Sequence, residues 1–328
     1  MAKITINPDQ VKFIATSNET ILNAGLAQKL NLSHSCKNGL CGSCKTKIIS
    51  GEVILDPYNP KTLTPEEQKQ GYTLLCRAHA LTDVVLDIPN LLCGFPVKIM
   101  PAKVISITKI NQIAIINLKL PANLAFGFYA GQYVDIMVKG KNRSYSIGIS
   151  PLQKDEIEIH VKNYPGGIFS EYVWNELKVN DILRFKGPLG SFQLQHTNKP
   201  IICVCTGTGF APIKAILEDM YLREDPRPIT FYWGNSEIKD FYCVEVIEKW
   251  RHKLNIKIVL CISQNKESGY FFGRVTDALI NDFNDLSNHE VYACGNPRMI
   301  ESLFELSCTQ LRLLRDNFFS DAFIPSAI

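Results

Sequence analysis

Four cysteines near the start of the chain stand at a spacing that is typical of a metal cluster. They are Cys36, Cys41, Cys44 and Cys76, in the order C-x4-C-x2-C followed by a distant fourth cysteine. Plant-type [2Fe–2S] centres use this ligand pattern, in which four thiolates hold the cluster. Structural zinc sites usually pair two short knuckles, and here only Cys41 and Cys44 have that spacing. The pattern therefore predicts an iron–sulfur cluster, with zinc or four buried thiols as alternatives.

The tetrapeptide Arg143-Ser144-Tyr145-Ser146 combines side chains that suit a phosphate-bearing aromatic ligand. A guanidinium fork fits phosphate oxygens, a phenol ring offers a flat face with a polar tip, and a hydroxyl both donates and accepts hydrogen bonds. Taken alone the motif is weak, because alternating arginine and tyrosine are ordinary in a strand.

Two glycines before a predicted helix form a candidate anion site. Gly166 and Gly167 precede a helix that should begin near Phe169, and a helix start exposes unpaired backbone N–H groups that bind phosphates. The alternative is a plain glycine turn with Ser170 as the helix cap.

A glycine loop follows the apolar strand Ile201 to Cys205 and opens another helix. In this loop Gly207, Thr208 and Gly209 precede Pro212, so backbone N–H groups and the helix dipole can meet a dinucleotide pyrophosphate. The third glycine of G-x-G-x-x-G is missing, which argues against an ordinary Rossmann dehydrogenase. A later segment also follows an apolar strand, and its residues are Ala293-Cys294-Gly295-Asn296-Pro297.

The elements that must position these residues fall into three units within 328 residues. Residues 1–95 begin with a predicted hairpin, Lys3 to Ile6 and Val11 to Ala15, and continue into one helix, which predicts a small sheet with the cysteine loop at its edge. Residues 97–197 contain regular short strands, which predict an antiparallel barrel. Residues 198–328 alternate strands and helices, which predicts an α/β unit with a parallel sheet. A Gly- and Pro-containing segment, residues 90–101, is the expected linker.

The order of these motifs resembles the ferredoxin–NADP reductase superfamily, in particular the bacterial reductases with an N-terminal plant-type ferredoxin domain. The resemblance covers the whole chain. It implies a β-grasp-like [2Fe–2S] domain at 1–95, an FAD-binding β-barrel at 97–197 and an NAD(P)-binding α/β domain at 198–328. The chain ending and the segment Met100 to Val104 look most like the CDP-6-deoxyglucoseen reductases and their relatives among phenol and aromatic oxygenase reductases.

The resemblance also implies roles for single residues. Arg143 would bind the flavin pyrophosphate, Tyr145 would stack on the flavin, and Ser146 would donate to the ring nitrogen that accepts hydride. Cys294 would lie beside the nicotinamide. The remaining implied cofactor contacts are Ser144, the His160 backbone, Gly166, Gly167, Ser170, Gly207, Thr208, Gly209, Pro212, Gly295, Pro297 and a C-terminal aromatic gate, Phe319 or Phe323.

A reductase of this kind would pass electrons from NADH through FAD and the cluster to a partner protein, either a deoxysugar dehydrase or an oxygenase component. The segment after Trp233 has no arginine for a 2′-phosphate, and Glu237 would suit a free ribose hydroxyl, so NADH is favoured and NADPH is left open. FMN is not excluded by the motifs. Two other hypotheses remain: a redox-sensing module with flavin and an iron–sulfur cluster, and a plain flavin reductase.

Composition narrows the partners and the compartment. The net charge of +3 and the scattered basic residues argue against nucleic acid and an anionic membrane surface. The longest apolar stretches are strand-sized and the start has no apolar signal region, so neither a membrane span nor an export signal is expected. Eleven cysteines in such a chain predict reduced thiols in the cytoplasm.

Overall fold

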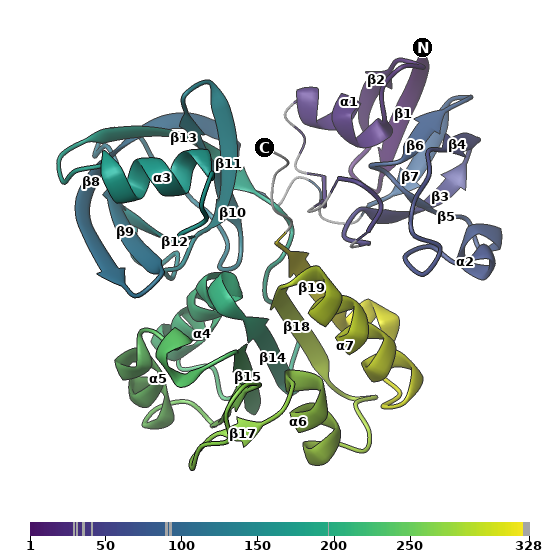
Figure 1. The fold of residues 1–328 in the computed structure, drawn as a ribbon. Coiled ribbons are helices and arrows are strands. Elements are labelled where there is room, and N and C mark those ends of the chain that lie inside the picture. The colour runs from purple at the N-terminus through teal and green to yellow at the C-terminus, as the bar shows by residue number, and fades with distance from the viewer. Residues whose placement is uncertain are drawn as a thin grey trace. The chain divides into compact units, whose positions relative to one another are not determined.

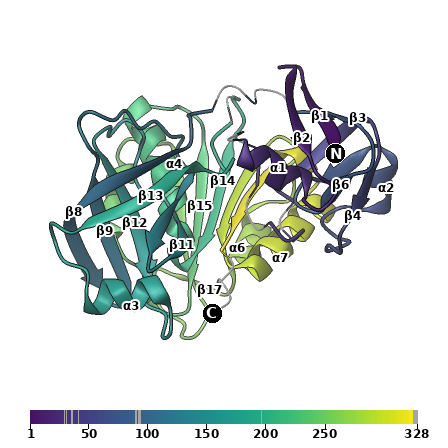
Figure 2. The same ribbon diagram turned by 90° about the horizontal axis from the view of Figure 1, so that it is seen from above.

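The computed structural model describes residues 1–28, 30, 32–34, 37–40, 42–88, 91, 94–195 and 197–323. The chain forms two compact units. The first contains Met1–Val97 with Leu189–Ser191, and the second contains Lys98–Pro188 with Phe192–Ile328. Figures 1 and 2 show the elements of each unit from two directions.

The first unit holds a five-stranded sheet in the order β2-β1-β7-β3-β5 and a small β4-β6 pair. The predicted hairpin is β1 and β2, which pair antiparallel, while β1 and β7 pair parallel as in a β-grasp sheet. The side chain of Thr20 accepts from the Asn23 N–H and so begins the one long helix, which buries Ile21 and Leu22 against the sheet. The elements are β1 (Ala2–Asn7), β2 (Val11–Ala15), α1 (Ile21–Ala27), β3 (Lys45–Ser50), β4 (Val53–Leu55), α2 (Pro65–Lys69), β5 (Tyr72–Leu74), β6 (Ala78–Ala80) and β7 (Val84–Asp87).

The second unit begins with the six-stranded antiparallel sheet that the short strands predict, in the order β11-β10-β13-β8-β9-β12. Alternating apolar side chains fill its interior, and α3 adds Phe169 and Val173 to the same core. Figures 1 and 2 both place α3 beside these strands. The elements are β8 (Lys98–Ile110), β9 (Ile113–Lys119), β10 (Tyr133–Val138), β11 (Lys141–Ser146), β12 (Glu156–Lys162), α3 (Ile168–Asn175) and β13 (Ile182–Leu189).

The expected linker is shorter than the sequence suggests, because β8 already begins at Lys98 and includes Pro101. Pro101 opposes Arg184 of β13, whereas the pairing of β8 with β9 starts only at Lys103. The strand is therefore paired on one side only at Pro101, where a missing N–H is tolerated.

The rest of the second unit is a parallel six-stranded sheet in the order β17-β16-β15-β14-β18-β19. Side chains of β14 alternate between two cores, with Cys203 and Cys205 on the face of α4 and α5, and Ile202 and Val204 on the face of α6 and α7. Figure 1 shows these helices on both sides of the sheet. The elements are β14 (Ile201–Thr206), α4 (Phe210–Arg223), β15 (Ile229–Asn235), α5 (Val244–Arg251), β16 (Ile256–Ile262), β17 (Phe271–Phe272), α6 (Val275–Asp282), β18 (Glu290–Gly295), α7 (Pro297–Thr309) and β19 (Phe318–Ala322).

Candidate functional sites

The cysteine loop is partly described, since Cys36 and Cys41 lie outside the described residues. Cys44 precedes β3 and Cys76 follows β5, and the Leu75 N–H donates to the Cys44 carbonyl, which brings the two cysteines to the same end of the strand pair. Both side chains are buried, at 3% exposed. Two buried thiols at one strand end fit a thiolate-held cluster.

The loop backbone of this segment requires glycine at position 39. Gly39 has a φ of +78°, and a Cβ there would lie 2.6 Å from the Cβ of Tyr58. Asn59 N–H donates to the Gly39 carbonyl, and Thr62 Oγ1 donates to the Leu40 carbonyl. The segment from residue 58 to 62 therefore holds the described part of the loop in place.

The predicted flavin residues come from β11 and the start of α3. The half-buried guanidinium of Arg143 donates to the Asn142 carbonyl at 3.0 Å, and among the described residues it makes no other hydrogen bond. Such an unfilled fork fits a phosphate. The ring of Tyr145 lies 5.1 Å from the ring of Phe169, so the structure brings the tetrapeptide and the α3 start together. Ser146 ends β11 and is buried.

Burial raises the pKa of Tyr145 well above its usual value, although the nearby Arg143 acts in the opposite direction. The phenol therefore stays neutral at physiological pH. A neutral, flat ring is what stacking on a flavin requires. By contrast, the hydroxyl of Ser144 donates to Asp135 at 2.6 Å and is already used within the barrel.

The glycine pair before α3 is only partly open to an anion. Gly166 has a φ of +77° and open space around it, but its N–H donates to the Glu171 carboxylate at 2.8 Å. Ser170 donates to the Tyr164 carbonyl, and no side chain caps the helix, whose first flanking residue is Gly167. An anion at this helix start would therefore have to displace Glu171 from the Gly166 N–H.

The two nucleotide loops at the ends of β14 and β18 contact each other through their backbones. A Cβ on Gly209 would lie 2.3 Å from the Cys294 carbonyl oxygen, so only glycine fits there. Thr206 Oγ1 accepts from the Asn296 N–H at 3.1 Å. The Trp233 indole donates to the Gly207 carbonyl, and its ring stacks on Phe210 at 4.0 Å. These contacts fix the open Gly207 turn, which has a φ of +53°.

A cavity of about 640 Å³ lies at these loops, between the barrel and the parallel sheet. Of the residues predicted from the sequence, the cavity is lined by Gly207, Thr208, Gly295, Pro297 and Phe323. Its barrel side consists of residues 110–113, Lys162 and Tyr164. A cleft at the carboxyl ends of parallel strands is where dinucleotides bind in open α/β sheets, so these residues fit a nicotinamide dinucleotide.

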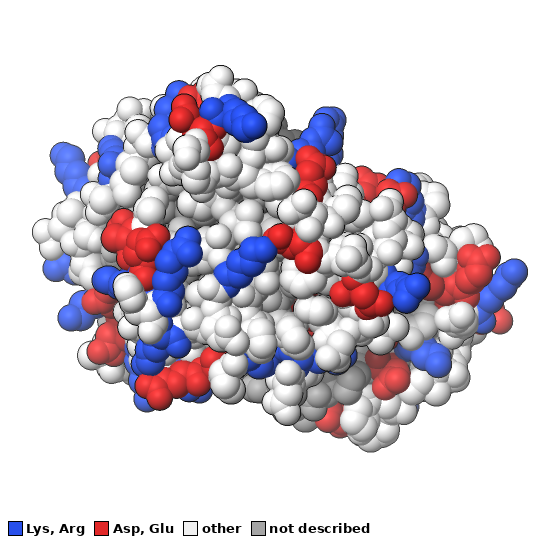
Figure 3. All heavy atoms as spheres, turned by 90° about the horizontal axis from the view of Figure 1, so that it is seen from below, with Lys and Arg blue, Asp and Glu red and all other residues white. Residues whose placement is uncertain are grey.

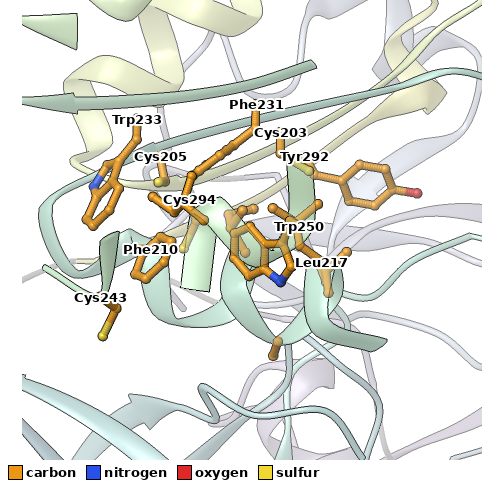
Figure 4. Close-up of a cluster of buried hydrophobic side chains, with 14 of the residues drawn as sticks. Cys203, Cys205, Phe210, Leu217, Phe231, Trp233, Cys243, Trp250, Tyr292 and Cys294 are labelled. Atoms are coloured by element: carbon orange, nitrogen blue, oxygen red, sulfur yellow. The ribbon is translucent and has the colours of Figure 1, made fainter. Parts of the chain in front are cut away.

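Three of the predicted nucleotide residues lie behind the cavity wall. Gly209, Pro212 and Cys294 do not line the cavity among the described residues. The Cys294 side chain is fully buried in an apolar cluster with Cys205 and Phe210, as Figure 4 shows. Burial, with the nearby Asp321 and Cys205, raises the pKa of the Cys294 thiol, so the thiol stays protonated.

The two gate candidates occupy different places. The Phe323 N–H donates to the Gly295 carbonyl at 2.8 Å, and Phe323 lines the cavity. Phe319 stacks on Tyr292 at 5.0 Å and packs against the apolar cluster. Both rings pack against the apolar cluster, but of the two only Phe323 lines the cavity among the described residues.

Glu237, expected at the ribose, pairs with a lysine that lines the cavity. Its carboxylate lies 2.9 Å from Lys239, and it is not among the described cavity residues. The cavity wall at this point includes Asn235 and Ser236 at the end of β15, Arg274 just before α6, and Lys239 and Asp240.

A polar network between the barrel and α4 was missed by sequence reasoning. His160 is buried, with Nε2 at 2.8 Å from Glu158 and Nδ1 at 2.9 Å from the Tyr242 hydroxyl, and Tyr242 lines the cavity. The Lys214 amine lies 3.0 Å from the same Glu158 oxygen. The sequence contains one signal of this network: Lys214 is the single charged residue in the otherwise apolar run from Phe210 to Leu217.

Charged side chains of both signs are interspersed over the face that Figure 3 shows, and among its described residues no broad patch of one sign forms. None of the helices in the described ranges combines the length and the apolar composition that a membrane span needs.

Comparison with known protein families assigns three successive segments. Residues 4–81 match the 2Fe-2S iron-sulfur cluster binding domain, residues 101–194 match the oxidoreductase FAD-binding domain, and residues 203–304 match the oxidoreductase NAD-binding domain. The three assignments carry the cofactors expected from the sequence: a [2Fe–2S] cluster, FAD and NADH.

Relatives of known function match from end to end. The CDP-6-deoxy-L-threo-D-glycero-4-hexulose-3-dehydrase reductase of Yersinia pestis is 37% identical over 98% of both chains. The reductase component of propane 2-monooxygenase from Mycolicibacterium smegmatis is 31% identical over 98% of this chain and 97% of its own. Among solved structures, the Amycolatopsis cytochrome P450 reductase GcoB is 25% identical, covers 100% of both chains and superposes with a TM-score of 0.79.

These relatives are reductases that serve a dehydrase or an oxygenase partner, and the order of domains matches the order of motifs along this chain. The chain is an oxidoreductase that passes electrons from NADH through FAD and a [2Fe–2S] cluster to an acceptor protein, and it belongs to the ferredoxin–NADP reductase superfamily, among the bacterial reductases with an N-terminal plant-type ferredoxin domain.

Proposed function

We propose that the acceptor of this reductase is a dehydrase that acts on a CDP-linked deoxyhexulose. The observation that supports this choice is the end-to-end similarity to the Yersinia pestis dehydrase reductase, at 37% identity over 98% of both chains. The similarity to the propane 2-monooxygenase reductase component is lower, at 31%. An oxygenase component is therefore the second candidate for the acceptor.

The proposed sites follow the three segments of the chain. Cys36, Cys41, Cys44 and Cys76 hold the cluster, and Arg143 and Tyr145 bind the pyrophosphate and the ring of FAD. Ser146 faces the hydride-accepting nitrogen. The loops at Gly207 and Gly295 bind NADH in the cavity of about 640 Å³, and Phe323 covers the nicotinamide side. The proposed domain limits are 1–95, 97–197 and 198–328.

The need for both FAD and the cluster follows from the number of electrons that each cofactor transfers at a time. When bound, FAD takes hydride from NADH and releases the two electrons singly, as a one-electron cluster requires. The residues of this chain supply position, a neutral ring at Tyr145 and a cavity for the nucleotide. Because reduced thiols and NADH belong to the cytoplasm, we place the protein there.

The acceptor can be tested by reconstitution. Purified reductase, loaded with FAD and iron, is mixed with NADH, a CDP-deoxyhexulose dehydrase and its sugar substrate, and NADH oxidation is followed at 340 nm. We expect oxidation that requires both dehydrase and sugar. Oxidation that instead requires an oxygenase component and O₂ would assign the second candidate. If the reductase reduces even ferricyanide only slowly, with no acceptor protein present, both candidate acceptors would be contradicted.

A further inference from the structure

The amine of Lys214 is the most deeply buried lysine group at the junction of the barrel and α4, at 5% exposed for the residue. It donates to the Gly148 carbonyl at 2.8 Å and lies 3.0 Å from Glu158 Oε1 and 3.3 Å from Glu218 Oε1. Its three hydrogens therefore have three acceptors. A buried ammonium is tolerated only when it is compensated in this way.

Two of these acceptors belong to the barrel, so the lysine joins α4 to the strands that carry the proposed flavin residues. Gly148 stands two positions after Ser146, and a Cβ at Gly148 would lie 3.0 Å from Glu158 Oε1 and 3.0 Å from His160 Nε2. Next along the chain, the Ser150 N–H donates to Glu218 and its hydroxyl donates to Asp219. One face of α4 thus holds the backbone from Gly148 to Ser150.

The Glu158 carboxylate is also connected to the nucleotide cavity through hydrogen bonds. Glu158 accepts from His160 Nε2, and the other ring nitrogen of His160 lies 2.9 Å from the hydroxyl of Tyr242, a cavity residue. With Nε2 donating to the carboxylate, Nδ1 of a neutral ring accepts from the tyrosine. The network therefore links the α4 helix, the end of β11 and the cavity wall through hydrogen bonds that cross the junction.

We propose that Lys214, acting through Glu158 and Gly148, is a positioning residue for hydride transfer: it sets the placement of the nucleotide loop that begins α4 relative to the strand end at Ser146. The proposal rests on the proposed roles of Ser146 and the Gly207 loop. Reacting atoms must meet at about 3–3.5 Å, so a small change in this placement has a large effect on rate. Apolar contacts across the junction hold the barrel and α4 together without fixing their exact relative position. The hydrogen bonds of the lysine select one such position.

The test compares Lys214→Met with Lys253→Met in the FAD- and iron-loaded protein. Lys253 forms a surface ion pair with Glu224 in the same domain and touches no barrel residue in that pair, so it is the matched control. Stopped-flow bleaching of the flavin over a range of NADH concentrations separates the limiting rate from the nucleotide Kd. For Lys214→Met we expect the limiting rate to fall about a hundredfold, with a Kd and a flavin content close to the control. The melting temperature should fall as well, because Glu158 and Glu218 lose their buried cation.

A second readout does not depend on the loaded enzyme. Hydrogen exchange of the flavin-free protein should rise in the peptide that contains residues 146–150 for Lys214→Met and not for Lys253→Met. The reason is that the Glu218 carboxylate, which accepts from the Ser150 N–H, loses the lysine that holds it. If Lys214→Met fails to fold, Glu158→Gln serves instead, since it keeps an acceptor oxygen and removes the charge.

Three results have distinct meanings. An unchanged limiting rate in the folded variant overturns the positioning role. A fall in rate that is no larger than the fall in flavin content also overturns it, because it shows a structural contribution alone. Failure of the unaltered protein to bleach with NADH would instead contradict the function, which separates the two questions.

Discussion

The side-chain oxygen of Thr206 accepts a hydrogen bond from the backbone N–H of Asn296 at 3.1 Å, although the two residues are ninety positions apart. The bond joins the last residue of β14 to the turn after β18. A Cβ on Gly295 would lie 2.6 Å from the same Thr206 oxygen, so the two turns are in direct contact. The nucleotide cavity is therefore built from two loops that support each other.

Replacing Thr206 by valine should weaken nucleotide binding, because the Asn296 N–H loses its acceptor and the second turn loosens. One net hydrogen bond is worth about 0.5–1.5 kcal/mol, so we expect a Kd for NADH that rises by up to about tenfold. Quenching of tryptophan fluorescence by the nucleotide measures this. Thr206→Ser keeps the hydroxyl and is the control; equal losses in both variants would contradict the hydrogen-bond explanation.

The cluster should depend on the four proposed cysteines and on no others. We expect purified protein to contain about two irons per chain and to show the rhombic EPR signal of a reduced plant-type centre. Cys44→Ser should abolish this signal and cytochrome c reduction but keep NADH–ferricyanide activity, because the flavin alone can serve a small acceptor. Cys308→Ser, in α7, is the control. Zinc in place of iron after anaerobic purification would refute the prediction.

Flavin retention should depend on Arg143. A charge-assisted phosphate contact contributes about 1.5–3 kcal/mol, so Arg143→Ala should weaken FAD binding by about one to two orders of magnitude. The visible spectrum of the cluster should persist. Arg184→Ala, an exposed position on β13 of the same barrel, should keep its flavin. Measuring FAD released on gel filtration decides the outcome, and full flavin content in Arg143→Ala would count against the motif.

Cys294 separates a role beside the nicotinamide from a role in the core. A sulfur that packs on the bound nicotinamide should make Cys294→Ser slow in flavin reduction, by about a hundredfold if reacting atoms shift near 1 Å, with little change in affinity. A residue with a packing role alone should leave the rate of flavin reduction unchanged and only lower the melting temperature, because the serine hydroxyl is poorly satisfied. The fully buried cluster around Cys294 leads us to expect the loss of stability in either case. Stopped-flow bleaching read beside a melting curve measures both effects.

The Glu158–Lys214 pair should stabilise the fold over a defined pH range. Burial acts to raise the pKa of Glu158, but the His160 hydrogen bond and the Lys214 charge outweigh it, so the folded pKa lies below the ordinary 4.5. A lowered carboxyl pKa gives stability that is present above the unfolded value and is lost as pH falls through the folded value. Urea unfolding should show Glu158→Gln to be destabilised at pH 7, with a smaller difference from the unaltered protein near pH 4. A difference that grows toward low pH would contradict this sign.

Much of this protein could be predicted from local sequence. The spacing of Cys44 to the other cysteines, the turn at Gly207 and the helix start near Phe169 are set by chemistry within a few residues, since turns and helix starts require particular residues at fixed offsets. The order of the three segments could also be predicted from the sequence, because apolar residues recur at a different period in strands than in helices.

Contacts across long separations could only be read from the tertiary structure. The packing of two sheets decided that Lys214 meets Glu158 and Gly148, and that Cys294 points into the apolar cluster and not the cavity. A sequence pattern records which residue types are present and how they alternate. It does not record which distant acceptor a buried charge will reach, because that depends on how separate elements pack, and the partner of Lys214 was therefore settled by the fold.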